Sequence, residues 1–547
     1  MSSSACPHLE KTAVGTRLVV NDKPFLMLAG ELNNSSASSS RYMSRIWPEA
    51  GNNGINTLLA GVSWEMIEPV EDNFDFSELD KVITGAREHS MHLVILWFGS
   101  FKNGLSTYAP AWVKKNLDRF PRVQILKEDQ TRQTIEMLSP FSEAAVKADA
   151  KAFSKLMDHI KHVDAGFSTV VMVQVENETG VLGDSRDRSP LAEAAFKDPV
   201  PDTLLEHLRS ITCHPQFAKR FGLPRDTKNS WTSIFGNQMA ADEAFMAYHI
   251  SSYVGKVAAA GKAVHAIPLY TNAWLNADDT STLDLQGMLL KTGAKSIPGV
   301  YPSGGPVAHM MDIWRFNAPS LDFVSPDIYF HDYESMCQDY TRQGNLLFIP
   351  EQRKDAYGCR RIWLAYGTYD ALGTSPFGVD TGVDHVGREY RLLSKVKNDV
   401  LRTSIDQRFG FFFDDESGDL SKKSWVKEFG DIKVIVERAF VFGRPGPGAG
   451  MVIYRGNNKF LLVGYGFQVR FEAVAKNVSF VGILHAEEKE VDDAGNLTTL
   501  RVFNGDETRG GESMVMPNEN PDYGSFPIAV SVPANTGIAE VEAYVID

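Results

Sequence analysis

The sequence predicts an α/β fold, a (β/α)8 TIM barrel followed by a small all-β sandwich domain. Strand-like apolar runs alternate with amphipathic helical runs over most of the first 400 residues. Near residue 410 the pattern changes to short alternating runs separated by Gly, Asn and Pro. A chain of 547 residues is also too long for one ordinary hydrophobic core. We therefore expect the barrel at residues 1–409 and the all-β domain at residues 410–547.

The barrel requires eight parallel strands, and the sequence offers eight candidates. Each is a short apolar run bounded by turn residues, which is typical of a strand covered on both faces. A doubly wound parallel sheet is the alternative, but no GxGxxG motif follows the first strand. The predicted strands are residues 25–30, 55–64, 92–100, 170–177, 266–274, 321–330, 346–352 and 361–367.

Helices are predicted between these strands from the spacing of apolar side chains. In residues 77–90 the apolar side chains recur at i, i+3, i+4 and i+7, and residues 151–163 repeat the pattern. These spacings place one apolar stripe on each helix, facing the barrel strands. The stripes consist of Leu79, Val82, Ile83 and Ala86, and of Phe153, Leu156, Met157 and Ile160.

The predicted β domain is a series of short alternating runs, which favours a sandwich. A Gly- and Pro-rich stretch at 443–450 is predicted to be a loop within it. The runs are residues 432–443, 450–474, 479–491, 498–507 and 526–546.

Composition excludes several classes of partner. The formal net charge of −14 argues against binding nucleic acid or an anionic membrane, because both require a basic surface. No run of 18 apolar residues is present, so no membrane span is predicted. The first residues lack a basic segment followed by an apolar one, so we expect a cytoplasmic protein. Secretion stays open if a signal peptide preceded this start, and a homo-oligomer stays open as well.

No metal or organic cofactor is expected. The four cysteines are scattered without a CxxC pair, which indicates free thiols rather than a zinc site or a disulfide framework. HExxH, GxSxG and P-loop motifs are absent from the sequence. The cysteines are Cys6, Cys213, Cys337 and Cys359.

Polar and aromatic residues follow the predicted strands, at the barrel end where active sites form. Carboxylates, amides and indoles together suit sugars, because hydroxyl groups need polar partners and sugar CH faces stack on aromatic rings. The candidate catalytic residues are Glu178 and Glu351. The candidate substrate-binding residues are Glu31, Asn33, Trp64, Trp97, Asn103, Asn177, Asn272, Trp274 and Tyr329.

Two carboxylates at these positions can cleave a glycosidic bond. Glu178 follows the fourth predicted strand and Glu351 ends the seventh, so the two face each other across a closed barrel. One protonates the leaving oxygen and the other attacks the anomeric carbon. Tyr329 is placed to donate a hydrogen bond to Glu351. The alternative roles are a surface carboxylate for Glu178 and a salt bridge to Arg353 or Lys354 for Glu351.

Strand alternation places Glu176 on the same side as Glu178 but one layer deeper. We therefore expect Glu176 to have a structural role inside the barrel wall, because a buried carboxylate is seldom tolerated without a partner.

The stretch "QVENETG" resembles the "QVENEYG" stretch of family 35 glycoside hydrolases, the clan A β-galactosidases. "AGEL" at 29–32, residues 54–80 and "LFIPEQ" at 347–352 are similar to further strand units of that family. The resemblance covers about residues 25–380 and implies Glu178 as acid/base, Glu351 as nucleophile and Asn177 as ligand of the sugar 2-hydroxyl.

The sequence departs from that family at its third strand. Lys102 and Asn103 stand where the family carries an acidic residue that contacts galactose. This departure concerns the sugar rather than the bond cleaved.

The sequence thus predicts a retaining exo-glycosidase that hydrolyses terminal non-reducing β-D-galactosides by double displacement. One alternative keeps the chemistry and changes the sugar, as in a β-glucosidase or another exo-β-glycosidase acting on oligosaccharides or plant glycosides. The alternative from another class is a barrel that binds glycans without catalysis. In each case the partner is a small-molecule or oligosaccharide glycoside.

Overall fold

The computed structural model of the protein describes residues 6–222, 230–276, 297–383, 385–414, 424–439, 446–518 and 532–546. Its chain forms two compact units. The first comprises Met1–Glu10, Leu18–Gln352 and Gly373–Gly382, and the second comprises Lys11–Arg17, Arg353–Leu372 and Val383–Asp547. The predicted boundary between residues 409 and 410 stays a prediction.

The first unit contains a closed barrel of eight parallel strands, as the sequence predicts. Three short strands precede it, β1 (His8–Thr12), β2 (Gly15–Val20) and β3 (Lys23–Phe25), of which β2 and β3 pair antiparallel. The barrel order is β10-β11-β12-β13-β4-β5-β6-β9. The strands are β4 (Met27–Glu31), β5 (Thr57–Ser63), β6 (His92–Lys102), β9 (Val170–Asn177), β10 (Leu269–Trp274), β11 (Phe323–Ile328), β12 (Phe348–Gln352) and β13 (Gly373–Pro376).

Seven of the eight predicted strands coincide with barrel strands, and the eighth prediction is wrong. Residues 361–367 belong to helix α14 (Ala356–Thr368), and the eighth strand is β13. All residues from Gly358 to Gly367 are buried, so the segment lacks the polar face that marks a helix in a sequence. A short apolar run of this kind does not distinguish strand from helix by periodicity. The Asp355 side chain begins the helix by accepting from the Gly358 N–H.

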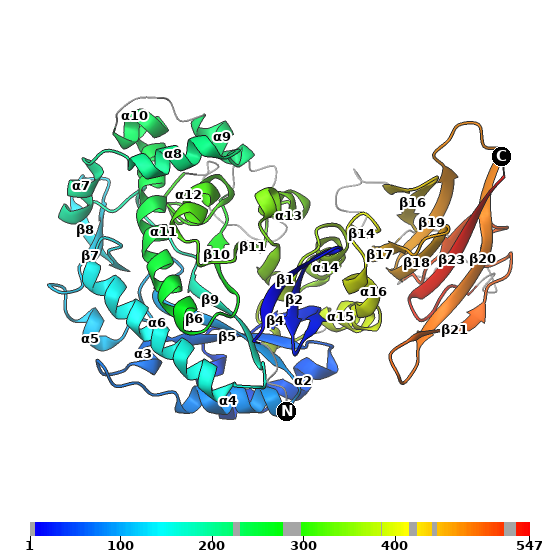
Figure 1. The fold of residues 1–547 in the computed structure, drawn as a ribbon, viewed down its shortest axis with the longest axis horizontal. Helices are drawn as coiled ribbons and strands as arrows, with labels where there is room; N and C mark the ends of the chain where they lie inside the picture. Colours follow the sequence, from blue (N-terminus) through cyan, green and yellow to red (C-terminus); the bar gives the residue numbers. More distant parts are fainter. Residues whose placement is uncertain are drawn as a thin grey trace. The chain divides into compact units, whose positions relative to one another are not determined.

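Helices separate the barrel strands along the chain, and Figure 1 shows α4, α6 and α11 on the outside of the barrel. The predicted apolar stripes of α4 and α6 are buried, as the spacing indicates. Helices between the first strands are α1 (Ser40–Met43), α2 (Ile46–Asn52), α3 (Trp64–Ile67), α4 (Ser77–Glu88), α5 (Ala111–Lys114) and α6 (Glu143–Val163). Those that follow are α7 (Pro190–Phe196), α8 (Asp202–Ser210), α9 (Pro215–Phe221), α10 (Trp231–Phe235), α11 (Gln238–Val264), α12 (Met311–Asn317) and α13 (Tyr333–Tyr340).

One β-hairpin interrupts the barrel pattern between β6 and β9. It consists of β7 (Arg122–Leu126) and β8 (Arg132–Leu138), which pair antiparallel. Barrel strand β9 follows α6, and all eight of its residues are buried. This burial explains why residues 170–177 read as an unbroken apolar run that ends in polar side chains.

The second unit contains two antiparallel sheets that form the predicted sandwich. Ring contacts between Phe411 and Phe467, at 4.8 Å, and between Phe460 and Phe471, at 5.1 Å, join the two sheets. Helices α15 (Val386–Lys395) and α16 (Lys397–Arg402) precede it. One sheet has the order β14-β17-β18-β23-β20-β21 and the other β15-β16-β19-β22.

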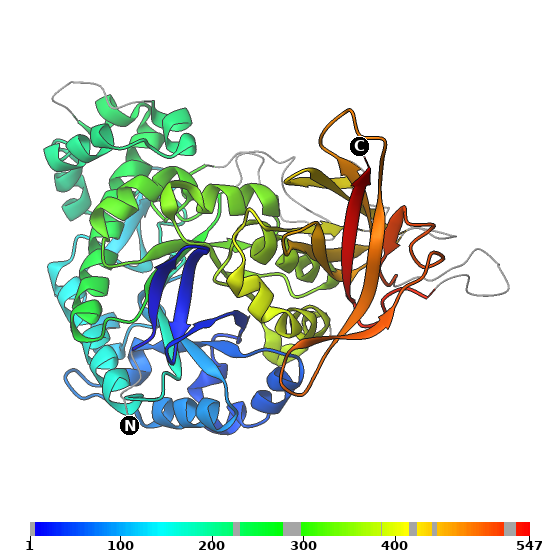
Figure 2. The same cartoon turned by 45° about the vertical axis from the view of Figure 1, so that its right-hand side comes forward.

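The red strand β23 lies beside the long orange strand β20 in this sandwich (Figure 2). Of the predicted loop at 443–450, residues 448–450 begin strand β17, and residues 443–445 lie outside the described part. Part of the predicted run 526–546 also lies outside it. The larger sheet consists of β14 (Arg408–Phe413), β17 (Gly448–Tyr454), β18 (Lys459–Tyr465), β20 (Phe480–Val491), β21 (Leu497–Val502) and β23 (Ile538–Ile546). The smaller consists of β15 (Ser424–Phe429), β16 (Ile432–Arg438), β19 (Phe467–Ala473) and β22 (Ser513–Val515).

Within the described ranges, none of the helices combines the length and the apolar composition that a membrane span requires.

Candidate active site

Three carboxyl groups meet where β9, β11 and β12 end. Glu178 follows β9, Asp327 lies near the end of β11, and Glu351 lies in β12. One carboxylate oxygen from each lies within 4.8 Å of the others. All three side chains are buried. The closed barrel therefore brings together the two predicted catalytic residues, and it adds a third carboxyl group beside them.

Glu351 is held by three donors, each of them a predicted substrate-binding residue. Tyr329 donates its hydroxyl to Glu351 Oε2 at 2.8 Å. Asn177 and Asn272 donate their side-chain amides to Glu351 Oε1 at 3.3 and 3.4 Å. Hydrogen bonds to a carboxylate favour its ionised form and fix its orientation. The expected contact between Tyr329 and Glu351 is thus present.

Asn272 connects all three carboxyl-bearing segments. Its Oδ1 accepts the backbone N–H of Glu178 at 2.9 Å, and its Nδ2 donates to Asp327 Oδ2 at 2.7 Å. The same Nδ2 lies 3.4 Å from Glu351 Oε1. These bonds fix which end of the amide faces which partner, and they hold the end of β9 against β10.

The backbone at the end of β9 is strained. Glu176 and Glu178 have φ values of +60° and +43°, in the left-handed region that non-glycine residues seldom occupy. Such residues cost about 1–3 kcal/mol each and concentrate at functional sites. The turn directs Asn177 toward Lys102 and Glu351, its hydrogen-bond partners.

The predicted position of Glu176, on the same side as Glu178, is wrong. Its carboxylate accepts the backbone N–H groups of Ser100 and Phe101 at 3.2 and 2.6 Å, beside Asp149 of α6. Pairing between β6 and β9 shifts register between Trp97 and Lys102, so these two amides need a partner other than the ladder. The positive φ values break the strand alternation on which the prediction depended.

Burial and neighbouring charge raise the proton affinity of the site. Burial, and after it the neighbouring Glu351 carboxylate, raise the pKa of Glu178 to about 7, against the opposing effect of Lys102. Burial also raises the pKa of Glu31 well above its usual range, and the charge of Glu351 adds to this effect. A carboxyl group with a pKa near 7 can act as a general acid at neutral pH.

Lys102 is a buried cation at the edge of this group. It donates its Nζ to Asn177 Oδ1 at 2.9 Å, and the same Nζ lies 4.8 Å from the centre of the Phe98 ring. Next to it, Asn103 has a φ of +53°, and its buried Oδ1 has no hydrogen-bond partner among the described residues. A substrate hydroxyl is one group that can satisfy such an oxygen.

Glu31 is fully buried at the end of β4, and neither of its carboxylate oxygens has a hydrogen-bond partner in the described structure. A side chain at the preceding Gly30 would point toward Val379 and Ile55. Because successive side chains of a strand point to opposite faces, Glu31 points the other way, into the barrel. Its position therefore fits the predicted role as a substrate contact.

The three predicted tryptophans occupy different places. Trp64 and Trp97 are fully buried, with indole N–H groups bound to Glu68 and Asp149 at 2.8 and 2.9 Å. A sugar needs an accessible ring face for stacking, which these two side chains lack in this structure. Trp274, at the end of β10, is 41% exposed and offers such a face.

Asn33 bonds to Asp380 instead of to any of the three carboxyl groups. Its backbone N–H and its Nδ2 both donate to Asp380 Oδ1, at 3.0 and 2.9 Å. The structure therefore gathers Glu31, Asn103, Asn177, Asn272 and Tyr329 with the two catalytic candidates, while Asn33, Trp64 and Trp97 contact other partners.

Asp327 and Lys102 stand at predicted strand ends, but no catalytic or substrate-binding role was predicted for either. Each lies at the end of an apolar strand run, which is the signal that could have indicated a site role. Their partners lie on neighbouring strands, and the sequence does not show which residues of two strands are paired. Asp327 is in register with Glu351 on β12, and Lys102 contacts β9.

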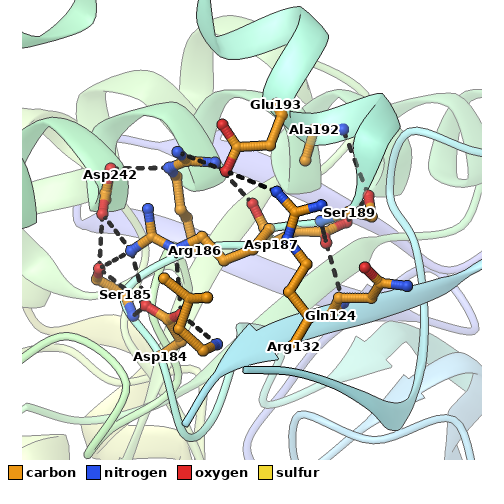
Figure 3. A network of polar contacts seen from close by, with 12 residues as sticks. Gln124, Arg132, Asp184, Ser185, Arg186, Asp187, Ser189, Ala192, Glu193 and Asp242 are labelled. Carbon is orange, nitrogen blue, oxygen red and sulfur yellow. Dashed lines mark hydrogen bonds and ion pairs between the residues drawn. The ribbon is translucent and has the colours of Figure 1, made fainter. Parts of the chain in front are cut away.

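A buried network of charges holds the segment that follows Glu178 (Figure 3). Asp242 on α11 accepts from Arg186 Nε at 3.0 Å, from Arg188 Nη2 at 2.8 Å and from Ser185 Oγ at 2.7 Å. Arg188 also bonds Asp184 at 2.8 Å. Removing one partner of such a buried pair leaves an uncompensated charge, so the network fixes one conformation of this segment.

The three clustered carboxyl groups are also the one set in the described part of the chain whose spacing could hold a metal ion. Acidic clusters are common without one, and Lys102 already places a positive charge beside them. The expectation that the enzyme needs no metal stays a prediction.

Two family models match parts of the chain. Residues 41–211 match glycoside hydrolase family 42, described as beta-galactosidase, and this stretch contains Glu178. Residues 386–515 match DUF5597, described as a domain of unknown function. A search of curated proteins gives no match.

Several solved structures are weakly similar to this one. The catalytic domain of a β-amylase from Paenibacillus polymyxa has 12% identity and a TM-score of 0.45, over 66% of this chain and 94% of that one. A β-galactosidase from Bacillus circulans sp. alkalophilus has 15% identity and a TM-score of 0.45, and the match covers 69% of this chain and 57% of that one. A β-galactosidase from the psychrophilic Marinomonas ef1 has 12% identity and a TM-score of 0.45. The match covers 70% of this chain and 61% of that one. The chain thus spans less than two thirds of both β-galactosidases.

The barrel, the facing carboxyl groups and the family match define a glycoside hydrolase. Residues 41–211 resemble a family described as beta-galactosidase, which agrees with the coarser prediction from the sequence. The finer prediction of family 35 is not confirmed, because the model that matches is that of family 42.

Proposed function

We propose that this enzyme is a retaining exo-glycosidase that hydrolyses terminal non-reducing β-D-galactosides, with Glu178 as acid/base and Glu351 as nucleophile. The observation that carries the proposal is the short separation of the two carboxyl groups, whose oxygens approach within 4.8 Å. Retaining enzymes place these groups about 5–5.5 Å apart, whereas inverting enzymes leave room for a water molecule between them at about 6.5–9.5 Å.

In the first step a Glu351 oxygen attacks the anomeric carbon while the bond to the leaving oxygen breaks. Glu178 gives its proton to that oxygen, and a glycosyl ester forms on Glu351. The donors Tyr329, Asn177 and Asn272 hold the attacking carboxylate in place. Because the hydrogen bonds are present before substrate arrives, little reorganisation is needed during attack.

In the second step the ionised Glu178 takes a proton from water, whose oxygen attacks the anomeric carbon. The ester bond breaks, Glu351 leaves as a carboxylate, and two displacements restore the original anomeric configuration. Asn177 donates to Glu351 and, as the family resemblance implies, would bond the sugar 2-hydroxyl. The exposed ring of Trp274 suits the aglycone side of the site.

The choice of galactose depends on the family description and on the resemblance of the strand units. One observation favours a different sugar as the second candidate. Lys102 and Asn103 stand where typical members of the resembled family 35 carry an acidic residue, and Lys102 donates to Asn177. A β-glucosidase or another exo-β-glycosidase is therefore the alternative.

A panel of p-nitrophenyl β-glycosides tests the sugar, and proton NMR of the first product tests the stereochemistry. We expect the galactoside to give the highest kcat/KM among galactoside, glucoside, fucoside, xyloside and glucuronide. The β anomer should be the first product, because double displacement retains configuration. A preferred glucoside would replace the sugar assignment, and an initial α anomer would overturn the retaining mechanism.

The rate should fall as pH rises through about 7. Glu178 has a pKa raised to about 7, and only its protonated form can donate to the leaving oxygen. An ordinary glutamic acid would already be ionised near pH 6, whereas Glu178 still holds its proton there. The pH profile of kcat/KM on an alkyl glycoside, a poor leaving group, should show this alkaline limb. An alkaline limb with its midpoint below about pH 5.5 would contradict the raised pKa of Glu178.

A further inference from the structure

Asp327 is a third carboxyl group that the two-carboxylate mechanism does not use. It is 3% exposed and lies in register with Glu351 on the neighbouring strand β12. One of its oxygens lies within 4.8 Å of an oxygen of Glu178. Three ionised carboxylates at this separation would repel one another strongly in a buried site, so the protonation state of Asp327 requires an explanation.

The hydrogen bonds of Asp327 distinguish its two oxygens. Oδ2 accepts the Asn272 amide at 2.7 Å, and Asn272 cannot reverse because its own Oδ1 accepts the Glu178 N–H. Oδ1 is buried and has no hydrogen-bond partner among the described residues. An ionised oxygen in this position would lack the donor that it needs, whereas a protonated Oδ1 becomes a donor itself.

The charges around Asp327 oppose its ionisation. Burial raises the pKa of Asp327 well above its usual range, and the carboxylates of Glu351 and Glu178 raise it further. One cation, Lys102, acts on Glu178 and Glu31. The titratable groups that face Asp327 from the surrounding elements are Glu31, Glu178, Tyr270, Tyr329, Tyr340 and Glu351.

We propose that Asp327 is a neutral carboxylic acid that donates a hydrogen bond from Oδ1 to the carboxyl group of Glu178. It is a positioning residue, and this inference rests on the proposed role of Glu178 as acid/base. Asp327 keeps its proton through both steps. Its hydrogen bond stabilises the Glu178 carboxylate after proton donation, and it offsets part of the effect of burial on that group.

Asp327→Asn tests the protonation state, because an amide reproduces a neutral acid with one donor and one acceptor. Its oxygen can accept from Asn272 and its N–H can donate to Glu178. The alkaline limb of the kcat/KM profile should stay within about 0.5 pH unit of the wild-type limb. If Asp327 is instead ionised, the substitution removes a negative charge and moves the limb down by about one unit or more, which would overturn the proposal.

Asp327→Leu removes both the donor and any charge while keeping a side chain that branches at Cγ. The loss of the donor should raise the pKa of Glu178 and move the alkaline limb to higher pH. The loss of an anion would lower that pKa and move the limb to lower pH. Exposed Asp118→Asn serves as the matched control and should leave the limb unchanged. Thermal unfolding of each variant identifies a loss of folding.

Infrared spectroscopy tests the proton without any substrate. At about pH 8, one unit above the pKa of Glu178, the wild-type minus Asp327→Asn difference spectrum should contain a protonated-carboxyl C=O band. The wild-type minus Asp118→Asn spectrum should lack it. If the band is missing, the proposal is overturned. Because this readout needs no turnover, it separates failure of this inference from failure of the proposed glycosidase function.

Discussion

Replacing Glu351 by alanine should abolish hydrolysis, with a loss of at least about 10⁴-fold in kcat, because the carboxylate that forms the glycosyl ester is removed. Tyr329, Asn177 and Asn272 all direct hydrogen bonds at this carboxylate, and they would lose their common partner. Added azide should restore part of the turnover by attacking in place of the missing carboxylate. The azide product should have the inverted configuration, which NMR of the glycosyl azide can measure.

Labelling of the wild-type enzyme identifies the same residue independently. A 2-deoxy-2-fluoro glycoside with a good leaving group slows both steps and allows the intermediate to accumulate. Mass spectrometry of a digest should then find the sugar on the peptide that contains Glu351. The exposed Glu88→Ala is the matched control, with activity close to wild type. Label on Glu31 or Asp327 would show that Glu351 is not the nucleophile, while the enzyme would still be a glycoside hydrolase.

Replacing Glu178 by glutamine should lower the rate on poor leaving groups by about 10²–10⁴-fold, because the amide keeps the shape but cannot donate a catalytic proton. Substrates with acidic leaving groups need little protonation and should lose less in the glycosylation step. The alkaline limb near pH 7 should disappear on alkyl glycosides, since the group whose pKa is raised to about 7 is gone.

The measurement is a plot of the rate against leaving-group acidity for wild type and variant. The slope should become steeper in Glu178→Gln, whereas Glu88→Gln should leave it unchanged. Equal losses on all leaving groups would indicate a binding or folding defect and would remove Glu178 from the acid role. A retained limb near pH 7 would assign that titration to another group.

The barrel strands could be predicted because their signal is local. Residues 170–177 form an unbroken buried run that ends in polar side chains, and β9 has these bounds. The same kind of signal failed at residues 361–367, where helix α14 is buried all round and shows no polar stripe. Periodicity distinguishes a helix from a strand only where one face is polar.

The positions of the site residues were predictable, but the direction of their side chains was not. Trp97 lies on barrel strand β6, yet it faces Phe153 of α6, at a ring distance of 5.8 Å. Glu176 leaves the expected alternation because its φ is positive and β6 offers it two unpaired amides. Neither the register shift nor the left-handed backbone has a clear mark in the sequence.

The sequence by itself determined the fold class, the strand ends that build the site and the selection of Glu178 and Glu351, because these follow from local periodicity and residue type. Only the tertiary structure decided that Asp327 joins them within 4.8 Å and that Asn272 bonds to all three segments. The physical reason is barrel closure: register between strands far apart in the chain sets which buried charges become neighbours, and those neighbours set each proton affinity.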